Sequence, residues 1–149
     1  MRTIDLLPPD PTHAPEGPGR ALLYPLWVIV LEIRPYPRAA PRTLRFSVDG
    51  HRNIPLPIRD VPETSPEPVA EDVRLVPAVP ENVAIDTTRH FVKKGLGSLG
   101  GLIARISILE TRKVWKLFWL TTGGDGKDAL VDSRSGTVIP MPDDLPFED

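Results

Sequence analysis

The chain contains no cysteine among its 149 residues. This absence excludes disulfides, thiolate zinc sites, iron–sulfur clusters and cysteine nucleophiles. Long apolar runs are also missing: the longest, residues 21–33, contains Pro25 and Glu32, whereas a membrane-spanning helix needs about 20 apolar residues. The first residues show no signal-peptide pattern. We therefore expect a soluble, cytoplasmic protein with no membrane span.

Proline and lysine are each confined to one part of the chain. Of the 19 prolines, 16 fall in residues 1–80 and none in residues 81–139. Residues 1–80 hold nine Arg and no Lys, and all five Lys lie between Lys93 and Lys127. Because proline interrupts helices, this distribution favours a β-rich α+β protein over a helical one.

Two stretches in the proline-rich half have the composition of strands. Residues 26–34 form a β-branched run between Pro25 and Pro35 and predict a central strand. Residues 43–49 alternate between apolar and polar side chains, which predicts a half-buried strand with Leu44, Phe46 and Val48 on the core face.

A hairpin is predicted at Asp49-Gly50, a dipeptide typical of tight turns. The return strand would cover residues 53–58. Its alternation predicts Ile54, Leu56 and Ile58 inward and the two prolines outward. Proline cannot donate a hydrogen bond to a neighbouring strand, so this strand is expected at a sheet edge.

The remaining elements are predicted to be short. A helix is expected over residues 88–96, followed by a glycine loop, because several glycines disfavour a longer helix. Strands are expected at 73–79, 105–110, 114–122, 128–132 and 137–139. The predicted fold is therefore α+β and β-rich, with antiparallel strands and hairpins, one short helix and a proline-rich extended N-terminal arm.

The domain organisation follows from the same composition. Residues 1–20 carry five prolines and predict an extended arm. Residues 21–142 are expected to form a single β-rich domain, interrupted by an acidic, proline-rich loop at 60–72. Residues 143–149 form an acidic tail.

No catalytic or metal-binding set can be assembled from the sequence. The three histidines, His13, His51 and His90, have no metal-ligand spacing. The carboxylates at Asp125, Asp128 and Asp132 lack the closing glutamate of a calcium loop. We therefore expect no enzymatic activity and no cofactor.

The glycines of residues 95–100 match the pattern G-x-G-x-x-G. A dinucleotide site needs a strand before this pattern and an acid about 20 residues after it. Residues 89–94 do not read as a buried strand, and the acid at Glu110 comes too early. The pattern is better explained as a flexible apolar loop.

Charge alternates in sign along the chain. Residues 87–124 have a net charge of +6, between segments of −6 (residues 60–86) and −5 (residues 125–149). Cations interleaved with aromatic residues can contact phosphates and bases. The alternative is that the acidic segments neutralise these cations and that the aromatic residues are buried. The candidate contacts for nucleic acid or a partner are Arg89, Lys93, Lys94, Arg112, Lys113, Lys116, Trp115 and Trp119.

Residues 114–139 resemble the strand region of PepSY-type domains, in which an aromatic-bearing strand precedes a strand ending in a D-x-x-T/S-G-x-V/I turn. The turn would be residues 132–138, DSRSGTV, and the aromatic Trp115 or Trp119. The chain departs from the family in the glycine-rich stretch where a helix should precede. The resemblance implies an α+β accessory or protein-binding module.

These observations predict a non-catalytic interaction or accessory module whose partner is another protein. The proline-rich arm and the acidic loop favour this function because both are more useful bound than free. The alternative is a nucleic-acid-binding protein that uses residues 87–124.

Overall fold

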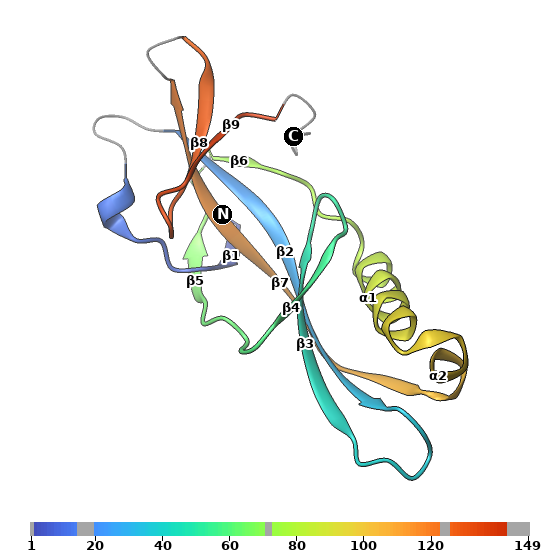
Figure 1. Ribbon diagram of the computed structural model, residues 1–149. Helices are drawn as coiled ribbons and strands as arrows, with labels where there is room; N and C mark the ends of the chain where they lie inside the picture. The colour runs from blue at the N-terminus through green and yellow to red at the C-terminus, as the bar shows by residue number, and fades with distance from the viewer. Residues whose placement is uncertain (1, 15–19, 71–72, 123–125, 143–149) are drawn as a thin grey trace. The chain divides into compact units, whose positions relative to one another are not determined.

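The computed structural model describes residues 2–14, 20–70, 73–122 and 126–142 (Figure 1). It is an α+β, β-rich protein with a mixed sheet and two helices, which confirms the predicted fold class. The mixed sheet differs in detail from the expected antiparallel one, because β1 pairs with β7, and β6 with β2, in parallel.

The chain folds into two compact units that alternate along the sequence. One unit comprises Met1–Pro25, Pro62–Pro77 and Val114–Asp149, and the other comprises Leu26–Val61 and Ala78–Lys113. The single β-rich domain expected over residues 21–142 stays a prediction. Two long strands, β2 (Arg20–Arg34) and β7 (Arg105–Thr122), contribute residues to both units.

The two units carry opposite net charges. The unit of residues 26–61 and 78–113 has twelve Lys and Arg against six Asp and Glu, a net charge of +6. The other unit has six against fourteen, a net charge of −8. We call them the basic unit and the acidic unit. The alternation of charge along the sequence therefore corresponds to a difference in net charge between the two sets of residues, although eight of the fourteen acidic residues counted here lie outside the described part of the chain.

The basic unit is a sheet with helix α1 (Glu81–Gly95) beside it (Figure 1). Its strand order is β4 (Pro55–Ile58), β3 (Arg42–Asp49), β2 and β7. Trp27, Ile29 and Val48 pack against Ala84 of α1, and Leu31, Ile33 and Phe46 pack against Val92, also of α1. The predicted central strand and the core face of β3 are therefore confirmed.

The predicted faces of β4 are wrong, although its place at the sheet edge is confirmed. Ile54 is 58% exposed and Leu56 63% exposed. Pro57 lies opposite Phe46 and Pro55 opposite Val48, so the prolines share the face of the core residues. The turn spans four residues, Gly50–Asn53, closed by the hydrogen bond from Asp49 N to Ile54 O at 3.0 Å, with Asn53 at a φ of 58°.

Helix α1 begins seven residues before the predicted helix. It follows Pro80, and its buried residues Ala84, Thr88 and Val92 recur every four residues. The Thr88 hydroxyl donates to the carbonyl of Ala84 at 2.8 Å, which satisfies this polar group within the helix. The expected glycine loop is also wrong, because residues Gly97–Ile103 form a second helix, α2.

The acidic unit is built from short strands around the parts of β2 and β7 that it contains. Strand β1 (Thr3–Leu6) pairs with β5 (Ser65–Pro68) and with β7, and η1 (Pro11–His13) follows it. Strand β6 (Arg74–Leu75) pairs with β2, while β8 (Asp128–Asp132) pairs with β7 and with β9 (Val138–Pro140).

Two sequence predictions for this unit need correction. The expected arm contains β1, and Ile4 and Leu7 are only 7% and 5% exposed, so residues 3–7 are docked rather than extended from the core. The expected loop at 60–72 contains β5, whose partner is β1. Residues 15–19, 71–72, 123–125 and the predicted tail, 143–149, lie outside the described residues.

Strand β7 is continuous over 18 residues, where two strands around residues 111–113 are expected. In the acidic unit it contributes to apolar clusters on both of its faces. Trp115 packs with Ile4 and Leu23 in one cluster. Phe118 and Leu120 pack around Leu22, Val76 and Leu130 in the other cluster. Because both faces are covered, this part of the strand offers little aromatic surface to a ligand.

Each unit has an edge strand with prolines in alternate positions. In β4 they are Pro55 and Pro57, and in β5 they are Pro66 and Pro68. Hydrogen-bonded and non-hydrogen-bonded pairs alternate in an antiparallel ladder. Asp49 N donates to Ile54 O, and Val69 N donates to Arg2 O. All four prolines are therefore at non-hydrogen-bonded positions, and their nitrogens face away from the neighbouring strand.

Candidate interaction surface

The eight predicted contact residues are divided between the two units. Arg89, Lys93, Lys94, Arg112 and Lys113 belong to the basic unit, whereas Trp115, Lys116 and Trp119 belong to the acidic unit.

The three predicted residues of the acidic unit are buried, half-buried or already paired within that unit. Trp115 is only 2% exposed, and the guanidinium of Arg2 lies 5.6 Å from its ring centroid. The Lys116 Nζ lies 2.6 Å from Asp132 Oδ2, and Trp119 is half-buried. Trp115 therefore cannot stack on a base, and Lys116 is neutralised by an acidic neighbour.

Asp132 also organises the turn between β8 and β9. Its Oδ1 accepts hydrogen bonds from the backbone N–H groups of Arg134 and Ser135. Burial raises the pKa of Asp132, but the Lys116 ammonium and these two N–H groups outweigh burial and hold the pKa below 3.8. The predicted turn between strands 128–132 and 137–139 is confirmed, with Gly136 at a φ of 76°.

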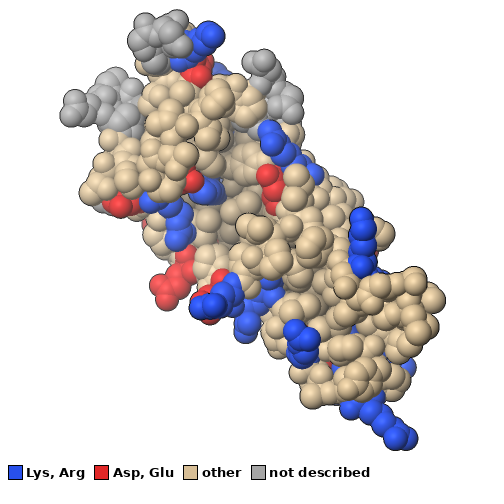
Figure 2. Space-filling view, in the orientation of Figure 1, with Lys and Arg blue, Asp and Glu red and all other residues tan. Residues whose placement is uncertain are grey.

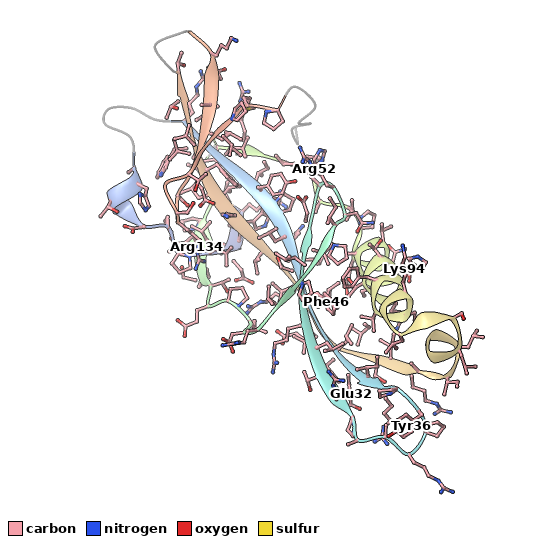
Figure 3. The ribbon with its side chains drawn as sticks, viewed as in Figure 1. Glu32, Tyr36, Phe46, Arg52, Lys94 and Arg134 are labelled. Carbon is pink, nitrogen blue, oxygen red and sulfur yellow. The ribbon has the colours of Figure 1, made fainter. Side chains whose placement is uncertain are left out.

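In the basic unit, two of the predicted residues are exposed and three are half-buried. The Nζ of Lys113 lies 5.8 Å from the ring centroid of Trp27, and Arg89 and Arg112 are half-buried. Lys93 and Lys94 are exposed in the last turn of α1, where cations interact favourably with the helix dipole. Figure 3 shows Lys94 on the solvent side of α1.

Exposed apolar side chains surround this pair of lysines. Leu99 is 69% exposed and Leu102 is 85% exposed, and α2 contains no buried residue. Figure 2 shows the surface over α1 and α2 as largely uncharged, with basic side chains beside it. We call this region the helical surface; its apolar members are Phe91, Leu96, Leu99, Leu102 and Ile103.

Glycine brings the two helices together. Gly97 has a φ of 78°, a conformation that other residues adopt at a cost, and α2 begins there. A Cβ on Gly101 would lie 3.0 Å from the carbonyl oxygen of Lys93, so α2 packs closely against the last turn of α1. The G-x-G-x-x-G pattern of residues 95–100 is thus preceded by a helix, α1, and not by the strand that a dinucleotide site needs.

A solvent-open cavity of about 400 Å³ lies between these helices. The polar members of its lining are two lysines, a histidine and a serine, and glycines and a leucine complete it. The lining residues are His90, Lys93, Lys94, Gly97, Ser98, Gly101 and Leu102. The cavity thus places cationic groups directly beside the most exposed leucine of the helical surface.

The sequence singled out Lys93 and Lys94 but not the leucines. Leu96, Leu99 and Ile103 follow helical spacing, which normally predicts a buried stripe. In the structure all three are exposed. The glycine content of α2 was the signal in the sequence for this exposure. Three of its seven residues are glycines, so the helix has little side-chain volume with which to bury its leucines.

No protein-family model, no curated protein and no solved structure matches the chain. In the described part of the chain, no helix is long and apolar enough to cross a membrane. Within those same residues, His, Asp and Glu side chains nowhere gather in threes that could hold a metal ion.

Proposed function

We propose that the protein is a non-catalytic interaction module that binds an acidic, apolar segment of another protein through the helical surface. The observation that carries this proposal is α2, a helix with no buried residue and with Leu99 and Leu102 largely exposed. Contiguous apolar residues exposed beside polar ones are typical of interaction sites.

The expected binding energy comes mainly from the leucines. Burying one leucine side chain contributes about 1.5–3 kcal/mol. Two such anchors with their neighbours can support a specific contact, as the buried anchors of helix-in-groove complexes do.

Charge determines the kind of partner. Lys93 and Lys94 flank the apolar residues, and the basic unit as a whole has a net charge of +6. A segment with Asp or Glu beside its apolar residues complements both features. Nucleic acid would complement the charge but not the exposed leucines, and Trp115 is too buried to stack on a base.

Site-specific cross-linking in cells tests the proposal. A photoreactive residue would replace Leu102, and, as a control, Leu109, which is 55% exposed on β7. We expect position 102 to capture a protein that carries an acidic, apolar segment, and position 109 to capture none. Cross-links from position 102 to nucleic acid or lipid would contradict the proposal, as would equal capture at both positions.

The captured protein would then be titrated against variants by fluorescence anisotropy. We expect the pair Leu99→Ser and Leu102→Ser to weaken binding by about tenfold or more, and the pair Lys93→Gln and Lys94→Gln to reduce its dependence on salt. Leu109→Ser is the matched control. Unchanged affinity in both double variants would overturn the proposal.

A further inference from the structure

A second cavity lies in the basic unit, and it does not involve the helical surface. It has a volume of about 400 Å³, which is within the size range of small-molecule sites. Its lining residues are Glu32, Arg34, Pro37, Arg105 and Ser107.

Strand alternation places these side chains on the face that α1 does not cover. Ile33 of β2 and Ile106 of β7 pack in the cluster that contains Val92 of α1. Their neighbours along the strands therefore face the other way. Glu32 and Arg34 come from β2, Arg105 and Ser107 come from β7, and the two strands are neighbours in the sheet.

The charged groups of this cavity are not used within the described chain. Glu32, Arg34 and Arg105 make no side-chain hydrogen bond or ion pair with any described residue. Charges of opposite sign that line one cavity usually pair when they come within reach. Here two guanidinium groups and one carboxylate remain available to a bound molecule.

The wall of the cavity is stiff. Pro37 lines it, and the loop that carries Pro37 also contains Pro35 and Pro41. The backbone N–H of Ala39 donates to the carbonyl of Tyr36 at 2.9 Å, which closes a turn in this loop. Figure 3 shows Glu32 on β2 and Tyr36 in the loop that follows it. A wall fixed in advance lowers the entropy lost on binding.

We propose that this cavity binds a small zwitterion carrying one carboxylate and one ammonium group. Arg34 and Arg105 would hold the carboxylate, because guanidinium groups match its geometry. Glu32 would accept hydrogen bonds from the ammonium group. The Ser107 hydroxyl could form a hydrogen bond with the carboxylate or with the ammonium group. A dianion such as phosphate fits less well, because Glu32 repels it.

Titration of ¹⁵N-labelled protein, followed by NMR, tests this assignment. The probes are glycine and 4-aminobutyrate, which differ in the distance between their charges, with acetate and protonated butylamine as single-charge controls. We expect saturable shifts around the cavity with at least one zwitterion, and about tenfold weaker binding of acetate and butylamine. No saturation with either zwitterion, or equal affinity for acetate, would overturn the proposal.

Variants locate the binding. We expect Glu32→Gln to reduce the affinity for the zwitterion to that for acetate, and Arg105→Gln to weaken it by about tenfold. Arg45→Gln is the matched control, because Arg45 lies opposite Val30 on the same face but does not line the cavity. An equal loss in the Arg45 variant would overturn the proposal. The Leu99→Ser and Leu102→Ser pair should leave zwitterion binding unchanged, which separates this site from the proposed protein contact.

Discussion

Pro57 of β4 lies directly opposite Phe46 of β3. Residues opposite each other in a ladder share a face, so Leu56 faces away from the core and is 63% exposed. We expect Leu56→Ala to change the free energy of unfolding by no more than about 0.5 kcal/mol. Phe46 is 4% exposed, and Phe46→Ala should cost about 3–5 kcal/mol. Urea unfolding of both variants measures this difference.

The sequence alone leads to the opposite expectation for Leu56. Replacing a buried leucine by alanine lowers the free energy of unfolding by about 2–5 kcal/mol. A loss of that size in the Leu56→Ala variant would therefore restore the register predicted from the sequence and contradict the pairing in the structure.

The contact between α1 and α2 depends on Gly101. A methyl group there would press on the Lys93 carbonyl oxygen at 3.0 Å, and a helix backbone cannot easily move away. We expect Gly101→Ala to lower the free energy of unfolding by about 1–3 kcal/mol. Gly95→Ala is the control, because a methyl group at that position meets nothing within 4 Å; it should be neutral or stabilise by up to about 1 kcal/mol. Equal effects in thermal unfolding would show that the helices do not pack in this way.

Acid should weaken the turn at Asp132. The pKa of this carboxyl group is lowered in the folded state, so its ionised form stabilises the fold. This stabilisation is complete above the ordinary value of 3.8 and is lost as the pH falls through the lower folded-state pKa.

The Asp132→Asn variant isolates this effect. We expect it to be less stable than the native chain at neutral pH by about 1–2 kcal/mol. The native chain should therefore melt at a higher temperature than the variant at neutral pH, and this difference in melting temperature should disappear once the pH is below the folded-state pKa of Asp132. A gap that stays constant with pH would mean that the ionisation of Asp132 contributes nothing to stability.

The N-terminal strand should be protected from hydrogen exchange. The backbone N–H of Leu7 donates to the carbonyl of Trp115 at 2.9 Å, and Leu7 is 5% exposed. Arg38, in the loop between β2 and β3, is exposed and serves as the comparison. We expect the Leu7 amide to exchange far more slowly. Equal rates for the two amides would support the extended arm that the proline content suggests.

The faces of β3 could be predicted from the alternation of its residues, and those of β4 could not. The core face of β3 follows from Leu44, Phe46 and Val48 alone. The faces of β4 depend on the number of residues in the turn, and Asn53 in a left-handed conformation lengthens it to four. A change of one residue in register moves every side chain of a strand to the other face.

The candidate sites were only partly predictable for a related reason. Lys93 and Lys94 stand out by charge, but the exposure of Leu99 and Leu102 depends on how α2 packs. The sequence predicts a helix only from residue 88, whereas Thr88 lies in the middle of α1 and its hydroxyl bonds within the helix. Glu32, Arg34 and Arg105 come together only through the pairing of β2 with β7, which no local pattern reveals.

The proline nitrogens on the outer sides of β4 and β5 decide how other molecules can approach this protein. An incoming strand recruits backbone donors from the edge it joins, and at these positions no donor exists. Neither edge strand can act as a template for another chain, whether of a partner or of a second copy. At these two edges another chain would have to contact side chains instead of adding a strand, so the same residues that keep helices out of the first half of the sequence also limit the growth of the sheet there.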